Sequence, residues 1–144
     1  MEAKELMIGD WVYAIDANGE KHPCRANNLE YDYTNKRGDF CVDFYGTGYD
    51  AEWPDIAFNV EPIPLTPEIL EKNGFVQKLK KYYTISIDTS LVIKREPIYG
   101  ANGNTFLLGY FVNRSGFQWF IELSYVHELQ HALRLCGIDK EINV

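Results

Sequence analysis

The last stretch of the chain contains a pattern associated with zinc chemistry. His127 and His131 are four positions apart and Glu128 follows the first of them, as in the H-E-x-x-H motif. Side chains at i and i+4 share one face of an α-helix, so the two imidazoles could hold one Zn²⁺ while Glu128 activates a bound water. Residues 125–136 have the helical periodicity that this arrangement requires. A zinc-dependent hydrolase is therefore one hypothesis for this chain.

Other features of the same segment favour an ordinary closing helix. A catalytic zinc normally has three protein ligands and a water. The extended pattern H-E-x-x-H-x-x-G-x-x-H is absent, because Arg134 stands at the glycine position. Its charge, one turn from His131, opposes metal binding. A helical wheel places both histidines on the expected solvent side, opposite an apolar stripe of Val126, Leu129, Ala132, Leu133 and Cys136.

The predicted ends of this helix are those of a surface element. We predict Ser124 as the N-cap, with Glu128 one residue beyond the capping-box position. Gly137 is suited to a left-handed residue after the helix, and Ile138 can then fold back onto Leu133. We therefore predict no catalytic residue, no metal ligand and no cofactor. Zinc, His127, His131 and Glu128 belong only to the alternative hypothesis.

A second set of residues combines positive charge with aromatic rings. Basic and aromatic side chains that alternate on a sheet can hold single-stranded nucleic acid by charge and stacking. The purely structural interpretation is a solvated strand edge, where lysines discourage pairing with another chain. The residues of this nucleic-acid hypothesis are Lys78, Lys80, Lys81, Tyr83, Lys94 and Arg95.

Two further groups in the first half are weaker candidates. His22, Cys24 and Cys41 could ligate a metal, but they contain no C-x-x-C pair, and buried free cysteines are more usual. An acidic set could bind a cation or a basic partner, although such residues more often keep a surface soluble. It comprises Asp39, Asp43, Asp50, Glu52 and Asp55.

The charge of the chain is unevenly distributed. Residues 1–65 hold thirteen acidic and five basic side chains, a net charge of −8, whereas residues 66–144 hold eight and nine, a net charge of +1. Their sum is the −7 of the whole chain. An acidic half repels phosphate, so this distribution disfavours a general nucleic-acid binder and favours a protein partner.

Cysteine usage and hydropathy indicate the compartment. The three cysteines are an odd number at wide spacing, which is typical of free thiols in a reducing environment. The N-terminus lacks the basic and apolar regions of a signal peptide, and no apolar run approaches the roughly 20 residues that span a bilayer. We expect a cytoplasmic protein without a membrane partner. Its oligomeric state is left open.

The first half has the pattern of short strands and turns. Strands are predicted at residues 6–15, 22–33 and 40–46, and Asn18-Gly19 is a strong hairpin signal between the first two. The order of these strands, with a first strand that follows the turn in "GDWV", predicts an SH3-like β-barrel over residues 1–65.

The second half, residues 66–144, predicts a helix, an antiparallel meander and a closing helix. Thr66 is an N-cap, Pro67 occupies the first helical position, and Gly74 ends the short helix. Three or four strands follow at residues 80–88, 90–99, 105–112 and 117–123, and alternation puts Phe117, Trp119, Ile121 and Leu123 on one face. The predicted class is α+β, and the two halves could pack as one domain.

Three islands of sequence resemble a known group. "IGDWVY", "PIPLTPEILEKNGF" and "YVHELQHALRLCGI" are similar to small uncharacterised proteins encoded in prophages and mobile elements of gut bacteria. Closing helices in that group resemble V-H-x-L-Q, which implies that Glu128 and His131 are incidental. The resemblance assigns no catalytic residue. We therefore expect a non-enzymatic interaction protein of phage or mobile-element origin that binds a protein partner, with zinc hydrolysis and single-strand binding as alternatives.

Overall fold

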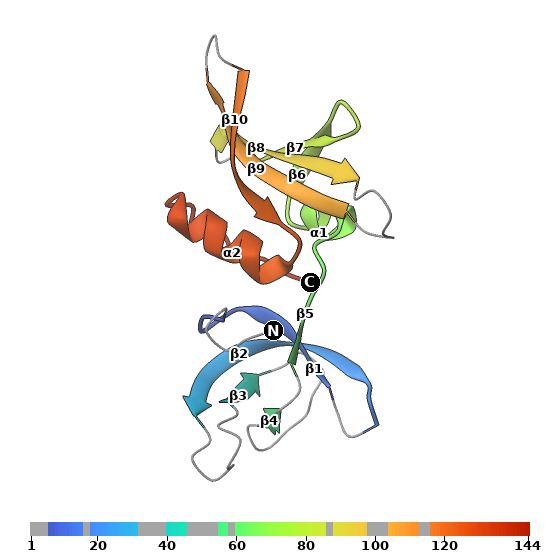
Figure 1. The fold of residues 1–144 in the computed structure, drawn as a ribbon, viewed down its shortest axis with the longest axis vertical. Coiled ribbons are helices and arrows are strands. Elements are labelled where there is room, and N and C mark those ends of the chain that lie inside the picture. Colours follow the sequence, from blue (N-terminus) through green and yellow to red (C-terminus); the bar gives the residue numbers. More distant parts are fainter. Residues whose placement is uncertain are drawn as a thin grey trace. The chain divides into compact units, whose positions relative to one another are not determined.

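In the part of the chain that the structure describes, the protein is mixed α+β, with two antiparallel sheets and two helices (Figure 1). The computed structural model describes residues 6–15, 18–31, 40–45, 55–57, 60–85, 88–97, 104–112 and 116–144. The chain divides into two compact units, Met1–Ile63 and Pro64–Val144. The boundary predicted from the sequence lies two residues later. Each unit is described separately below.

The described residues of the N-terminal unit form a five-stranded sheet in the order β4-β3-β2-β1-β5. Gly19, with φ 83°, lies between the first two strands, where the Asn18-Gly19 turn is predicted. The sheet is not closed into a barrel within the described residues, so the predicted closed form is not confirmed. The strands are β1 (Trp11–Ile15), β2 (Lys21–Tyr31), β3 (Phe40–Tyr45), β4 (Asp55–Ala57) and β5 (Val60–Pro62).

A tight turn precedes β1 and shortens the strand predicted from Leu6. Gly9 has φ 88°, and the buried carboxylate of Asp10 accepts a hydrogen bond of 2.7 Å from the backbone N–H of Met7. Because the chain turns here, β1 begins only at Trp11. Behind the turn, a small core is formed by Leu6, Val12, Cys24 and Ala26.

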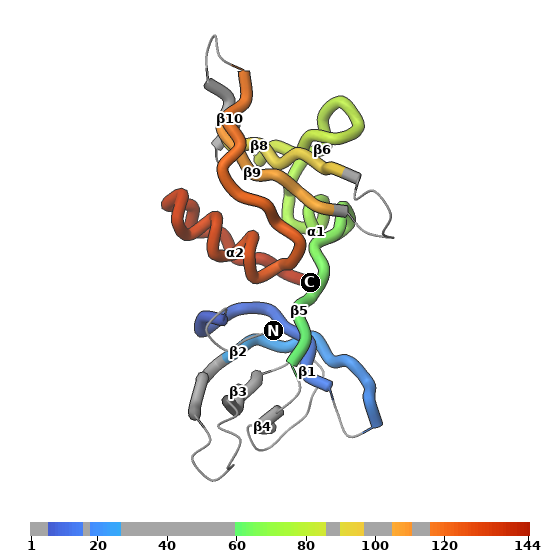
Figure 2. The backbone as a smooth tube through the Cα atoms, viewed as in Figure 1, coloured from blue at the N-terminus to red at the C-terminus, as the bar shows by residue number. Residues whose placement is uncertain are grey.

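The described residues of the C-terminal unit form a five-stranded antiparallel meander, preceded by one helix and followed by another, and the path of the chain can be followed in Figure 2. The sheet order is β10-β9-β8-β7-β6. The sequence predicts three or four strands here and does not predict the first of those observed, β6. The elements are α1 (Pro67–Lys72), β6 (Phe75–Lys78), β7 (Tyr82–Ile85), β8 (Asp88–Pro97), β9 (Asn104–Val112), β10 (Gly116–Leu123) and α2 (Val126–Leu135).

The first helix has the predicted caps. The hydroxyl of Thr66 accepts a hydrogen bond of 3.3 Å from the N–H of Ile69, Pro67 is the first helical residue, and Gly74 follows the helix with φ 77°. Asn73, at the end of the helix, fixes the C-terminal segment through two hydrogen bonds with the backbone of Asn143. Neither helix in the described part of the chain is long and apolar enough to cross a membrane.

One face of the C-terminal sheet forms the core of this unit. α1 packs on β6, and α2 packs on β10. The sheet and the two helices contribute apolar side chains that are almost completely excluded from solvent, and the largest are Leu70, Tyr83, Leu91, Ile93, Phe106, Leu108, Leu123, Leu129 and Leu133. The opposite face, which carries Tyr82 and Lys94, is called the outer face below.

Candidate functional site

The closing helix begins one residue later than predicted, and this changes the role of Glu128. Its N-cap is Tyr125, not Ser124. Glu128 therefore stands at the third helical position, where its carboxylate accepts hydrogen bonds from the N–H of Ser124 at 2.6 Å and of Tyr125 at 3.0 Å. Helix N-termini leave such N–H groups unsatisfied, so this carboxylate has a structural role.

The prediction that both histidines face solvent is wrong for the first. The side chain of His127 is 4% exposed and that of His131 is partly buried. The ring of Tyr125 stacks on His127 at 5.8 Å, and the ring of His131 meets its edge at 5.8 Å between centroids. The Nδ1 atom of His127 is buried without a hydrogen bond in the described part of the chain. A helical wheel represents no residue outside the helix, so it could not predict this burial.

The C-terminal end of this helix is as predicted. Gly137 has φ 71° and donates a hydrogen bond of 3.0 Å to the carbonyl of Arg134. Ile138 is buried and donates one of 2.9 Å to the carbonyl of Leu133. These two bonds are a Schellman closure.

The histidine pair lacks a third partner for metal chemistry in the described part of the chain. No group of three or more His, Cys, Asp or Glu side chains gathers among those residues. Cys24 of the second metal candidate is buried, and burial raises the pKa of its thiol to about 11. The side chain of Cys41 and those of the acidic set Asp39, Asp43, Asp50, Glu52 and Asp55 lie outside the described residues.

The register of the C-terminal sheet separates the basic and aromatic candidates between its two faces. Tyr82 pairs with Lys94 on the outer face, whereas Tyr83 pairs with Ile93 and belongs to the core. A fully buried ring cannot stack on a base, so Tyr83 must be replaced by Tyr82 as the candidate. Arg95 is adjacent to Lys94 in β8, so alternation places it on the core side. There it interacts electrostatically with Tyr83 and Glu68.

A β-bulge in β10 corrects another part of the prediction. The register shifts between Trp119 and Ile121, so that Trp119 pairs with Gly109 and Ile121 pairs with Leu108. Because adjacent residues of β9 point to opposite faces, Trp119 lies on the outer face and Ile121 on the core face. The sequence alternation had placed both on one face, together with Phe117.

Three rings meet on the outer face and form what we call the aromatic cluster: Tyr82, Phe117 and Trp119. Their centroids are 5.4 Å apart for Tyr82 and Phe117, 6.5 Å for Tyr82 and Trp119, and 5.3 Å for Phe117 and Trp119. The interplanar angles are 13–19°, so the rings are nearly parallel. Phe117 remains 39% exposed. The cluster thus offers aromatic surface to a ligand.

A glycine creates the space for the largest of these rings. A Cβ atom on Gly109 would lie 2.7 Å from Cε3 of Trp119 and 2.4 Å from the carbonyl oxygen of Gln118. The indole therefore passes closely over the backbone of β9. Val92, which pairs with Gly109 on the same face, is only 5% exposed. Part of the cluster therefore acts as a small second core.

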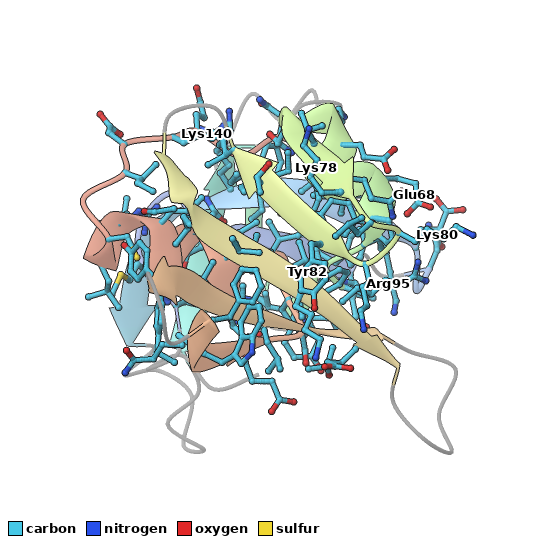
Figure 3. The ribbon with its side chains drawn as sticks, turned by 90° about the horizontal axis from the view of Figure 1, so that it is seen from above. Glu68, Lys78, Lys80, Tyr82, Arg95 and Lys140 are labelled. Atoms are coloured by element: carbon cyan, nitrogen blue, oxygen red, sulfur yellow. The ribbon has the colours of Figure 1, made fainter. Side chains whose placement is uncertain are left out.

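Two lysines lie against the aromatic cluster. The ammonium of Lys81 lies 5.7 Å from the ring centroid of Tyr82, and that of Lys94 lies 5.8 Å from the ring of Trp119 and pairs with Glu96. Lys78 and Lys80 are exposed on the β6–β7 hairpin, drawn in yellow-green in Figure 3, where Lys140 lies far from Lys80. Positive charge and aromatic surface therefore occur together on this face.

Comparison with known proteins identifies no family for this chain. No protein-family model matches the chain, and neither the curated proteins nor the solved structures contain a significant match.

The basic cluster in the sequence makes Lys78, Lys80, Lys81 and Lys94 candidates, but it does not point to Phe117 or Trp119. Tyr82 could have been chosen over Tyr83, since Tyr83 alternates with the apolar Ile85 on the face predicted to be buried. Nothing in the sequence predicts the bulge that places Phe117 and Trp119 on the same face as Tyr82.

Proposed function

We propose that the protein is a non-enzymatic binding protein whose C-terminal unit holds single-stranded nucleic acid on the outer face of its sheet. One observation carries the proposal: Tyr82, Phe117 and Trp119 are nearly parallel, and Lys81 and Lys94 lie against them. Bases stack on exposed rings, while ammonium groups neutralise the phosphates that connect them. No bond is made or broken in this activity.

The uneven charge of the chain is compatible with this proposal. The acidic excess of −8 belongs to residues 1–65, and residues 66–144 carry +1. Phosphate is therefore not repelled by the net charge of the C-terminal unit itself. Screening at physiological salt, with a Debye length of about 8 Å, further limits the reach of the carboxylates in residues 1–65.

The sharpest test compares two phenylalanines of one strand. Phe117 belongs to the aromatic cluster, whereas Phe120 is 49% exposed and stacks on Tyr110 instead. Fluorescence anisotropy with a labelled single-stranded oligonucleotide measures the affinity of Phe117→Ala and of the matched control Phe120→Ala. Loss of one stacked base costs about 1–3 kcal/mol, so we expect the first variant to bind roughly 5- to 150-fold more weakly. Equal losses in both variants would contradict the proposal.

The salt dependence of binding gives an independent measure. If Lys78, Lys81 and Lys94 each neutralise one phosphate, log K falls with log salt at a slope of about −2. Lys81→Gln should make this slope shallower by about 0.7. Lys140→Gln, on a lysine outside the β6–β7 hairpin that Figure 3 shows apart from Lys80, should leave it unchanged.

Binding of a protein partner is the second candidate function, and the N-terminal unit would bind this partner. Met7 and Ile8 are exposed apolar side chains on the rigid turn that Asp10 stabilises, within the acidic part of the chain. A partner that co-purifies with the wild-type protein should be lost when Met7 and Ile8 are both replaced by Ser. Recovery of the same partner by that variant would contradict this candidate.

Two finer proposals concern fold and origin. The strand order of the N-terminal sheet, in which the fifth strand returns to pair with the first, supports a partly open SH3-like barrel. An origin in a prophage or mobile element rests on the resemblance of the three sequence islands alone.

A further inference from the structure

The hairpin between β6 and β7 exposes an apolar side chain, Leu79, on a left-handed turn. Leu79 is 85% exposed, more than any other large hydrophobic residue among those described. It and Lys80 have positive φ angles of 51° and 64°. Left-handed backbone is disfavoured for residues with a Cβ atom, and turns of this kind usually contain Asn-Gly.

Hydrogen bonds from the strands beside this turn hold its conformation. The side-chain amide of Gln77 donates to the carbonyl of Lys80 at 3.0 Å and to the hydroxyl of the buried Tyr83 at 3.1 Å. The N–H of Arg95 donates to the carbonyl of Lys81 at 2.7 Å. Leu79 is therefore held in solvent at a defined place.

The positive charge around this leucine favours a partner that carries phosphate groups. Lys78, Lys80 and Lys81 flank it in an uninterrupted run, and each is exposed. The hairpin is continuous with the aromatic cluster, because Lys81 lies over the ring of Tyr82. A strand stacked on the cluster would thus have its phosphates drawn toward the hairpin tip.

We propose that Leu79 is a wedge that inserts between bases where a single strand meets a duplex. Apolar side chains of this kind, including leucine, separate base steps in other complexes. The aromatic cluster would hold the single-stranded side of the junction, and the three lysines would contact the phosphates on either side of the inserted leucine. This inference rests on the proposed function and defines the preferred nucleic acid, a junction.

The test compares three labelled oligonucleotides with the full chain: a single strand, a blunt duplex, and a duplex with a single-stranded overhang. We expect the overhang substrate to bind about tenfold more tightly than the single strand. Leu79→Ser should remove this preference and leave the single-strand affinity unchanged. Leu135→Ser is the matched control, since Leu135 is 83% exposed at the end of α2, and it should alter neither affinity.

A local probe tests insertion directly. A 2-aminopurine placed at the junction should brighten when the wild-type protein binds, because unstacking relieves its quenching, and should stay quenched with Leu79→Ser.

Failure of the wedge can be told apart from failure of the proposed function. Tight single-strand binding with no junction preference, or a preference that survives Leu79→Ser, overturns the wedge alone. No binding to any oligonucleotide overturns both. Binding to phosphatidylserine vesicles that is lost in Leu79→Ser would instead assign the hairpin to an anionic lipid surface.

Discussion

Replacement of Gly109 by alanine is the substitution whose outcome follows most directly from the geometry of the outer face. Gly109 does not have a positive φ angle, so alanine has no backbone penalty there. In open space, Gly→Ala at such a position stabilises a protein by about 0.4–1 kcal/mol, because it restricts the unfolded chain. The sign of the effect therefore reports whether space exists above β9.

The structure leaves no such space. The new Cβ atom would lie 2.4 Å from a backbone oxygen of Gln118 and 2.7 Å from Trp119, whereas ordinary contact begins at 3.4 Å. β9 and β10 would have to separate by about 1 Å, because a backbone atom cannot rotate away. Overpacking of this kind costs about 1–3 kcal/mol, so we expect Gly109→Ala to lose about 2–3 kcal/mol of unfolding free energy.

Urea denaturation followed by circular dichroism measures this loss. Gly74→Ala serves as a control, since Gly74 has φ 77° and open space around its Cα, and should lose about 1–2 kcal/mol from backbone strain alone. The double variant Gly109→Ala/Trp119→Ala should still be less stable than Trp119→Ala, because the clash with the carbonyl oxygen of Gln118 remains. If Gly109→Ala is as stable as the wild type or more so, the indole does not lie over β9 and the aromatic cluster is wrong.

Four other outcomes are expected. Lys80→Gly should raise the unfolding free energy by about 1 kcal/mol, because glycine adopts the left-handed turn without strain; a lower denaturation midpoint would contradict that turn. Glu128→Ala should lower it by about 1 kcal/mol through loss of the helix cap, and an unchanged midpoint would show that this carboxylate does not cap α2. Peptide mass mapping after alkylation at pH 8 should find Cys24 unmodified and Cys136 modified, because the pKa of the buried thiol is raised to about 11. Since the folded state keeps the Cys24 proton that the unfolded chain releases near pH 9, stability should fall between about pH 9 and 11, and a flat profile there would contradict the burial.

Local sequence chemistry predicted the elements that depend on their own residues. Thr66, Pro67 and Gly74 define the first helix, and Gly137 with Ile138 closes the last one, because caps are made by side chains and φ angles close in sequence. The meander was predicted for the same reason, since its strands alternate and turn residues separate them.

What the sequence could not predict depends on pairing between strands. A single bulged residue near Trp119 reverses which side chains face the core, and the alternation of β10 contains no sign of it. β6 was missed because its residues are mostly exposed and it is stabilised by pairing with β7. The burial of His127 is likewise missed by a helical wheel, which represents no neighbours outside the helix, such as the ring of Tyr125.

The measurement that tests the central claim most directly is the response of the indole N–H signals to a single-stranded oligonucleotide. The chain has three tryptophans; Trp119 belongs to the aromatic cluster, whereas Trp11 is buried in β1 of the N-terminal unit and serves as an internal control. Trp119→Phe assigns the signal in a two-dimensional ¹⁵N spectrum. We expect the Trp119 indole signal to shift progressively with added oligonucleotide while that of Trp11 remains in place. A saturating titration that leaves Trp119 unmoved, or that moves Trp11 instead, would contradict binding on the outer face.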